Sequence, residues 1–429
     1  MKKLRWSALK RHIALPLAIV AAVLIIAALV QVRGMEDQGT YEIAHLYGDP
    51  SVMKGINISG AIQDANHRTS FMWRHDQNHV DTKTEVFVNQ QKDRVYRYFR
   101  GMFHPINDYY YYVNEFKDLG FFVDRGTITD GNWKGHDSIN LDITVKPLVK
   151  KDNNIERLYV DRNNGLTETE GDIYFTLAST SEYKGMNGIY KLNFDQREEE
   201  TAPIMTFSLD NTTEEDGPRT AVLGLESVND ALALLLVKDD KLVIEGYRTD
   251  GAKLGEVVVA PFLFQHINAE LADDASLARY EVTYEAYSQE ETGVLSLSFN
   301  SNQSHRTIVT LQRSEEGFQL VDITEIDKED ELLRERSYNE FGERFITYRD
   351  GRLYYVGVFH EFLDNEGNAL DPMSPIRILV HVYEQGNIVY TGELITDIND
   401  DLLRVSPYDL SNYNYDRAEY RNVYDLYIH

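Results

Sequence analysis

No cysteine occurs among the 429 residues of this chain. Its absence excludes disulfide bonds, thiolate zinc sites and the attachment of a lipid to an N-terminal cysteine. Stability must then come from a packed core, and a chain of this length with 42% hydrophobic residues can form one. The length suits one large all-β domain or two ordinary domains.

Positive charge is scarce, and it is unevenly distributed. The chain has 43 Lys and Arg against 70 Asp and Glu, a formal net charge of -27. Six basic residues and no acidic residue lie in the first 33 positions, so the remainder carries 37 basic against 70 acidic residues, a net charge of -33. Such a surface repels phosphate backbones, which excludes nucleic acid as the expected partner and favours cations or basic partners.

Catalytic signatures are also missing. The sequence has no G-x-S-x-G elbow, no H-E-x-x-H zinc motif, no P-loop and no dinucleotide-binding fingerprint. A pair of carboxylates of the kind that cleaves glycosides cannot be recognised in this sequence, because 70 acidic residues offer too many possible pairs. The sequence favours a protein without catalytic activity and points to no catalytic residue.

One long hydrophobic run is present, and it is uncharged over residues 13–32. Twenty helical residues span about 30 Å, the thickness of a hydrocarbon core, whereas the apolar part of a signal peptide is usually about 7–15 residues. No A-x-A cleavage site follows the run, and most of the flanking basic residues precede it. The pattern predicts a retained single-pass anchor with a cytoplasmic N-terminus; the alternatives are a long cleaved signal and a buried helix of a soluble protein.

These features divide the chain into four parts. Residues 1–12 are expected to form a cytoplasmic tail, 13–32 the transmembrane helix, 33–50 a linker, and 51–429 an extracytoplasmic β domain. The expected location is the cell membrane. A cysteine-free domain outside the cytoplasm is more typical of bacteria than of the eukaryotic secretory route.

Beyond residue 50 the hydrophobic period is two, which is typical of strands. Residues 231–259 predict a three-stranded meander, and residues 344–359 and 376–394 predict hairpins around Asp350-Gly351 and Gly386-Asn387. The units recur at about 40–55 residues, the period of propeller blades. We expect an all-β, β-propeller-like domain of about seven blades, with six to eight allowed, closed by a C-terminal strand within residues 417–429. The alternative is two β-sandwich or barrel domains divided near residue 165.

Two stretches contain metal-ligand residue types. His75 and His79 would share a helical face, but on a strand they would lie roughly 13 Å apart, too far for one ion. Asp161, Asn163 and Asp172 occupy three ligand positions of an EF-type calcium loop, although glycine stands fifth instead of sixth. Solvated polar loops and a hairpin turn are the leading interpretations, so no cofactor is expected; the alternatives are calcium at the loop and zinc, manganese or nickel at the histidines.

Tyrosine is over-represented, with 28 residues. A row of four, Tyr109, Tyr110, Tyr111 and Tyr112, must place two rings on each face of a strand, and further tyrosines crowd the C-terminus, including Tyr413 and Tyr415. Tyrosine has an apolar body and a polar tip, so exposed rings can stack on sugars or form protein interfaces. The alternative is ordinary strand packing.

The anchor, the acidic outer domain and hairpins such as "VKDDKLVIEGYRTDG" together resemble the uncharacterised single-pass, propeller-like surface proteins of Gram-positive bacteria. The resemblance is one of architecture and transfers no functional residue. It implies a membrane-anchored binding or sensing module that engages a membrane protein, a cell-wall protein or an envelope ligand. The alternatives are an extracytoplasmic propeller enzyme acting on glycans and a structural or assembly factor of the envelope.

Overall fold

The structure is a computed structural model of the whole chain. It describes residues 14–36, 41–63, 67–77, 79–86, 104–116, 120–129, 132–141, 143, 145–147, 162–180, 183–194, 202–210, 220–239, 241–259, 262–264, 280–301, 305–327, 338–361, 374–396, 404–405 and 422–429.

The described residues form six antiparallel sheets of four or more strands, as the alternating sequence predicts. In ring order, the first sheet consists of β28 (Asn422–Ile428), β2 (Asn57–Gln63), β3 (His67–Arg74) and β4 (His79–Val86). The second consists of β5 (His104–Ile106), β6 (Tyr109–Phe116), β7 (Gly120–Thr129) and β8 (Asn132–Leu141). The third consists of β10 (Leu166–Thr169), β11 (Asp172–Phe175), β13 (Met186–Leu192) and β14 (Pro203–Ser208).

The fourth sheet consists of β15 (Ala221–Val228), β16 (Ala231–Lys238), β17 (Lys241–Arg248) and β18 (Lys253–Val259). The fifth consists of β19 (Tyr280–Gln289), β20 (Val294–Ser301), β21 (His305–Ser314) and β22 (Gly317–Asp327). The sixth consists of β23 (Tyr338–Arg349), β24 (Arg352–Glu361), β25 (Ser374–Glu384), β26 (Asn387–Thr396) and β1 (Tyr41–Gly48), with β27 (Arg404–Val405) beside β25. A separate pair joins β9 (Lys146–Pro147) to β12 (Tyr183–Lys184).

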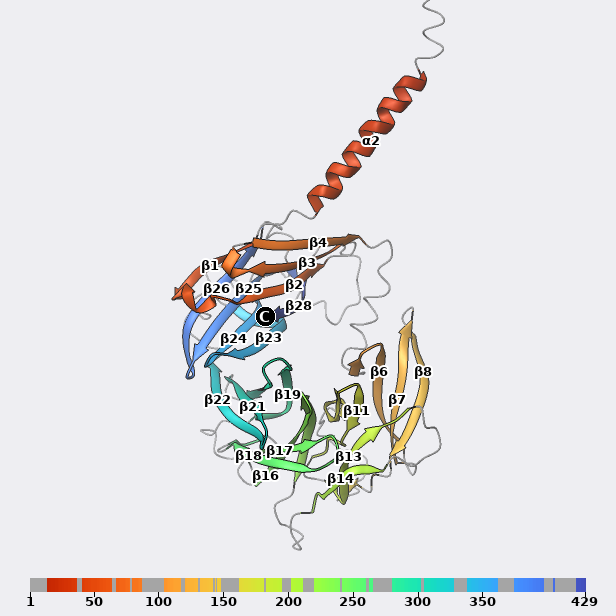
Figure 1. Cartoon of the computed structure of the whole chain (residues 1–429), viewed down its shortest axis with the longest axis vertical. Coiled ribbons are helices and arrows are strands. Elements are labelled where there is room, and N and C mark those ends of the chain that lie inside the picture. The colour runs from red at the N-terminus through yellow and green to blue at the C-terminus, as the bar shows by residue number, and fades with distance from the viewer. Residues whose placement is uncertain are drawn as a thin grey trace, which may run out of the picture.

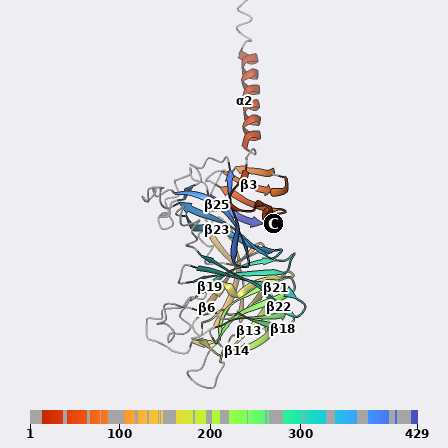
Figure 2. The ribbon, with the colours of Figure 1, turned by 90° about the vertical axis from the view of Figure 1, so that its left-hand side faces the viewer.

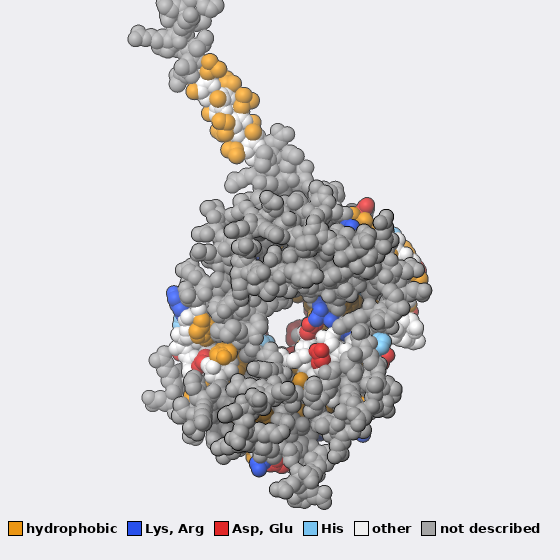
Figure 3. Space-filling model, turned by 180° about the vertical axis from the view of Figure 1, so that it is seen from behind, with side chains coloured by type: hydrophobic (Ala, Val, Ile, Leu, Met, Phe, Trp, Pro, Cys, Tyr) orange, Lys and Arg blue, Asp and Glu red, His pale blue; other side chains and the backbone are white. Residues whose placement is uncertain are grey.

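The six sheets lie around a centre, and the first strand of each sheet is the inner one (Figure 1). The inner strands β10, β15, β19, β23 and β28 contact their neighbours in that order. Figure 3 shows an opening at the centre of the ring with acidic and basic side chains around it. This arrangement is β-propeller-like.

The sheet count is one below the seven expected, and within the predicted range. Inner strands of the second to sixth sheets begin at residues 104, 166, 221, 280 and 338, so the spacing is 62, 55, 59 and 58 residues. Longer units than the expected 40–55 residues explain the smaller number of sheets.

The C-terminal strand closes the first sheet, as predicted for the end of the chain. β28 pairs with β2, and Ile428 lies opposite Ile58. The backbone groups of His429 and Asn57 exchange two hydrogen bonds of 2.9 and 3.1 Å. Pairing with β28 covers the inner edge of β2 and joins the C-terminus to the first sheet.

Local turn chemistry agrees with the sequence in most places. Two-residue hairpin turns at Glu170-Gly171, Asp350-Gly351 and Gln385-Gly386 have positive φ at both positions, the type I′ geometry that suits a twisted hairpin. The predicted Gly386-Asn387 turn is displaced by one residue, because Asn387 already pairs with Glu384 at the start of β26.

Apolar clusters seal five of the six junctions between sheets. One cluster joins the second, third and fourth sheets, a second joins the fourth and fifth, a third joins the fifth and sixth, and a fourth joins the sixth and first. The first of these crosses residue 165, where the two-domain alternative placed a boundary. Among the described residues, none of the four clusters joins the first sheet to the second.

The α-helix α2 (Ala14–Glu36) precedes the ring and extends away from it (Figures 1 and 2). The described side chains of α2, residues 17–30, are all exposed. Short 3₁₀ helices cover Pro50–Met53, His75–Gln77 and Arg162–Gly165.

Of the helices in the part of the chain that the structure describes, none is long and apolar enough to cross a membrane. The anchor therefore stays a prediction.

Candidate functional site

The tyrosine row lies on β6, where successive residues point to opposite faces of the second sheet. Tyr111 is buried and Tyr109 packs beside it in the apolar cluster shared with the third sheet. The Arg125 guanidinium lies over the Tyr109 ring at 4.7 Å and donates to Asp137 at 2.7 Å. These two tyrosines are therefore packing residues, as the strand interpretation predicts.

Tyr110 and Tyr112 point to the opposite face and remain partly exposed. Strand register places Gly126 and Asp124 opposite them on β7, and Gly135 and Ser138 follow on β8. We call this surface the aromatic face. Its described members include Pro105, Tyr110, Tyr112, Asn114, Phe122, Asp124, Gly126, Trp133, Gly135, Ser138 and Asn140.

Gly126 makes room for Trp133 on the aromatic face. A Cβ at Gly126 would lie 2.7 Å from Cη2 of the Trp133 ring, whereas a Cβ at Gly135 would make an ordinary contact, 3.4 Å from its Nε1. The indole therefore lies directly against the backbone of β7 at Gly126, a close approach that glycine permits. Trp133 remains partly exposed.

A polar pair lies beside the rings. The Asn114 side-chain amide donates to the Asp124 carboxylate, and both groups are partly exposed. A carboxylate has about four acceptor sites and an amide has two donors and an acceptor, so this single bond leaves capacity for a ligand's polar groups. The aromatic face thus combines apolar ring surface with planar hydrogen-bonding groups.

Because Tyr111 and Arg125 pack toward the third sheet, the aromatic face is turned toward the first sheet (Figure 1). That is the junction which none of the four apolar clusters of the described residues occupies. The second sheet thus presents partly exposed aromatic side chains at this junction.

The inner strands carry a second group of polar residues. The Tyr284 hydroxyl on β19 donates to Glu226 on β15 at 2.7 Å. Burial raises the pKa of Glu226 to about 7, although the Tyr284 hydrogen bond acts to lower it. A β-bulge between Val222 and Gly224 turns Glu226 toward the fifth sheet. A Cβ at Gly224 would lie 2.1 Å from the Tyr284 hydroxyl, so the contact requires glycine.

The opposite side of β19 carries an ion-pair cluster with the sixth sheet. Arg344 on β23 donates through Nε to Glu285 at 2.5 Å and forms a second bond through its Nη2. Arg306 reaches the same carboxylate at 3.8 Å, and the Tyr287 hydroxyl donates to it at 2.9 Å. Burial alone would raise the pKa of Glu285, but Arg344 outweighs this and holds it below its usual value. The cluster joins two sheets and already saturates its carboxylate.

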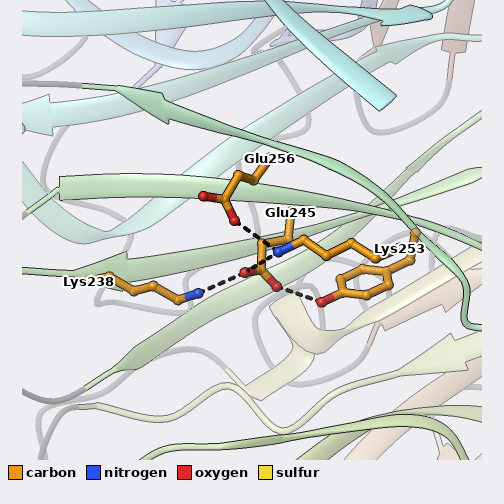
Figure 4. A network of polar contacts seen from close by, with 5 residues as sticks. Lys238, Glu245, Lys253 and Glu256 are labelled. Carbon is orange, nitrogen blue, oxygen red and sulfur yellow. Dashed lines mark hydrogen bonds and ion pairs between the residues drawn. The ribbon is translucent and has the colours of Figure 1, made fainter. Parts of the chain in front are cut away.

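A buried ion-pair network lies within the fourth sheet (Figure 4). Glu245 on β17 is only 5% exposed and accepts from Lys238 at 2.7 Å, Lys253 at 3.0 Å and the Tyr247 hydroxyl at 2.5 Å. Lys253 also pairs with Glu256 at 2.9 Å. Burial by itself would raise the pKa of Glu245. The three donors outweigh burial, and the pKa is lowered to about 2. All these groups belong to one sheet, so the network stabilises that sheet.

His381 on β25 is a further buried titratable group. It is 2% exposed and lies among the rings of Tyr355, Phe359 and Tyr383 at 5.7–6.4 Å between centroids. Its Nδ1 lies 3.1 Å from the Thr391 hydroxyl, and its Nε2 has no hydrogen-bond partner among the described residues. Burial lowers the pKa of His381 to about 4, so the ring is neutral at pH 7.

The structure describes only part of the predicted calcium loop. A strand occupies residues 166–169 within the proposed calcium loop, and Asp172 pairs with Lys191 at 2.5 Å. Asn163 lies in the 3₁₀ helix but its side chain, like all of Asp161, is outside the described residues. The described residues contain no cluster of three or more His, Asp or Glu side chains that could hold an ion. Calcium binding stays a prediction.

The predicted histidine pair is likewise described only in part. His75 lies in a 3₁₀ turn with its ring 5.5 Å from Trp73, whereas His79 begins β4 and its side chain is not described. Tyr413 and Tyr415 also lie outside the described residues. Sequence reasoning missed Trp133 and Glu226. Glycines inside a strand mark the close approach of another group, and this signal could have indicated Trp133.

No protein-family model matches this sequence, and no curated protein sequence matches it. Solved structures of similar shape include a putative 6-phosphogluconolactonase from Bacteroides fragilis, 10% identical over 80% of this chain and 95% of that one, with a TM-score of 0.32. The periplasmic gluconolactonase of Pseudomonas aeruginosa is 8% identical over 82% and 100%, with a TM-score of 0.27. Sqt1 of Saccharomyces cerevisiae is 9% identical over 80% and 82%, with a TM-score of 0.31. Scores this low support no argument about this chain. Its fold is therefore described from its own sheets, and its function is argued from its own residues.

Proposed function

We propose that this protein is a membrane-anchored, extracytoplasmic binding module of a bacterial cell surface, which engages an envelope ligand or partner through the aromatic face. The observation that carries the proposal is the partly exposed set of Tyr110, Tyr112 and Trp133 at the one junction without an apolar cluster among the described residues. Exposed aromatic groups of this kind are typical of binding surfaces.

The anchor part of the proposal draws support from α2. Its large apolar residues between Leu17 and Val30 are 55–67% exposed, so they have no protein core to enter. Six basic residues and no acidic residue surround the run in positions 1–33, which favours a cytoplasmic N-terminus. Residues 37–40 separate α2 from β1, so Tyr41 lies within about 18 Å of the helix end. A ring so tethered would work close to the membrane surface.

The absence of cysteine gives a direct test of this topology. A single cysteine at Glu315→Cys, in the exposed turn between β21 and β22, should react with a membrane-impermeant maleimide on intact cells. The matched variant Ser7→Cys should react only after permeabilisation. Labelling of Ser7→Cys in intact cells, or recovery of the chain only from the medium, would contradict the anchor.

Binding is tested with the full chain in detergent and envelope material from cells that lack the protein. Co-sedimentation should fall in the double variant Tyr110→Ala/Tyr112→Ala. The control is Tyr47→Ala, which removes a ring that is 50% exposed on β1, away from the aromatic face. Equal co-sedimentation of the double variant and the wild type would show that the aromatic face is not the binding surface.

A further inference from the structure

Glu226 differs from two other enclosed carboxylates of the ring in the kind of group that bonds to it. Glu245 accepts from two lysines, and Glu285 accepts two hydrogen bonds from Arg344. Glu226 accepts from the uncharged Tyr284 hydroxyl at 2.7 Å, and no Lys, Arg or His among the described residues acts on its pKa. A carboxylate that is taken out of water without a counter-charge is costly, so this site accommodates the protonated form best.

The elements packed around Glu226 bring no opposite charge to it among their described side chains. Across the fourth sheet, Ala233 lies opposite Glu226, and Gly246 lies opposite Ala233. Ionisable groups on these and the adjoining strands bond to other residues: Glu168 to Gly171, Asp230 to Arg313, Lys238 to Glu245, Tyr280 to Thr307, Glu281 to Thr283, Glu285 to Arg344 and Glu290 to Asn229. The Tyr284 hydroxyl is therefore the group that responds to the charge of Glu226.

Three sheets meet closely at this contact. A Cβ at Gly224 would lie 2.1 Å from the Tyr284 hydroxyl and 2.5 Å from the carbonyl oxygen of Asn164, in the 3₁₀ helix that precedes the third sheet. Glu226 is nevertheless partly exposed, and β15 is the inner strand of its sheet (Figure 1), so the carboxyl can exchange a proton with water. An ionised carboxylate at this place gains solvation by moving toward water, and that movement breaks the contact between β15 and β19.

We propose that the Glu226–Tyr284 contact is a pH-sensitive switch between the fourth and fifth sheets, closed when the Glu226 carboxyl is protonated and opened when it loses its proton to water. In the closed state Tyr284 donates to Glu226; in the open state water solvates the carboxylate, and β15 separates from β19 at this point. At the proposed location outside the cytoplasm, where the surroundings set the pH, acidification tightens the centre of the ring. The switch is independent of the aromatic face and of the proposed binding function.

The direction of the effect follows from the difference in proton binding between the two states. The closed carboxyl has a pKa of about 7, whereas an open and solvated carboxyl has the ordinary value of 4.5. Opening is therefore hardest below pH 4.5, becomes easier as the pH rises toward 7, and changes little above it. Between pH 5 and pH 8 the open fraction should rise by as much as about 70-fold.

Hydrogen exchange of the full chain in detergent tests the switch, with exchange times corrected for the pH dependence of the intrinsic rate. After this correction, amides of β15 and β19 should exchange faster at pH 8 than at pH 5, and those of β2, in the first sheet, should change less. The gain should disappear in Glu226→Gln, which keeps an acceptor for Tyr284 but cannot ionise. No gain in the wild type, or an equal gain in Glu226→Gln, would overturn the proposal.

Two further variants assign the effect to this contact, and they decide the matter even if Glu226→Gln does not fold. Tyr284→Phe removes the donor that lowers the pKa of Glu226, so exchange of β15 should continue to rise above pH 7 instead of levelling off. Glu285→Gln removes a carboxylate with a cationic partner from the same strand, and β15 should keep its wild-type pH dependence. Levelling off at the same pH in Tyr284→Phe, or loss of the pH dependence in Glu285→Gln, would show that the switch is not the Glu226–Tyr284 contact.

Discussion

The Tyr284 hydroxyl donates a hydrogen bond of 2.7 Å to Glu226, a residue 58 positions earlier in the chain and on the inner strand of the preceding sheet. The same relationship recurs around the ring at separations of 58–61 residues. The other pairs are Thr167 with Ser227, Glu168 with Ser227, Thr169 with Asn229, Asn229 with Glu290, and Glu285 with Arg344. These polar contacts thus repeat with the period of the sheets, and they join the third sheet to the fourth, the fourth to the fifth and the fifth to the sixth.

Gly224 allows the first of these contacts, so its substitution should disturb the junction. In Gly224→Ala the new Cβ would lie 2.1 Å from the Tyr284 hydroxyl and 2.5 Å from the carbonyl oxygen of Asn164, which must move. We expect a loss of about 1–3 kcal/mol in the free energy of unfolding, measured by chemical denaturation. Gly135→Ala is the control, because its nearest atom is 3.4 Å away; an equal loss there would contradict the steric explanation.

Glu226 should make the fold less stable as the pH rises. Its folded pKa of about 7 lies above the ordinary value of 4.5, so the folded state binds more protons between pH 4.5 and 7. The stabilisation is present below pH 4.5 and is lost as the pH rises through 7, by at most about 3 kcal/mol. Glu226→Gln keeps an acceptor for Tyr284 but cannot titrate. The difference in unfolding free energy between pH 5 and pH 8 should shrink in this variant; an unchanged difference would show that Glu226 titrates normally.

His381 should have the opposite effect. Burial lowers its folded pKa from 6.5 to about 4, so the unfolded state binds more protons between these values. Stability is therefore full above pH 6.5 and falls by about 3 kcal/mol as the pH drops to 4. In His381→Gln, the denaturation midpoint should fall less between pH 7 and pH 4 than it does in the wild type. Since Glu226 and His381 oppose each other over this range, Glu226→Gln alone should make the acid limb steeper.

The Glu245 network should protect the fourth sheet against acid. Its pKa of about 2 lies below the ordinary 4.5, so its contribution is present above pH 4.5 and is lost as the pH falls to 2. We expect Glu245→Gln to cost about 3 kcal/mol at pH 7 and almost nothing at pH 2, measured by urea denaturation. The control is Glu256→Gln, which removes one partner of Lys253 but leaves its ion pair with Glu245 intact. This variant should lose less than about 1 kcal/mol of unfolding free energy. Equal costs would mean that burial of Glu245 adds nothing.

The strands were predictable because their signal is local. Alternating apolar residues and the Asp350-Gly351 turn specify a hairpin whatever surrounds it, and the structure confirms both. The alternation at Tyr109 to Tyr112 likewise required two rings on each face, which the register of β6 confirms. The exact turn at Gln385-Gly386 was missed by one residue, because hairpin register depends on which residues pair across the strands.

The sequence by itself determined the all-β class, the acidic surface, the absence of disulfides and the closing C-terminal strand, since composition and a period of two express these directly. Only the tertiary structure decided the six-sheet ring and which tyrosines are buried. It also brought Trp133 onto Gly126 and Glu226 beside Tyr284. These relationships join different strands or residues about 60 positions apart, and a pattern read along one strand contains no information about which distant strand will pack against it.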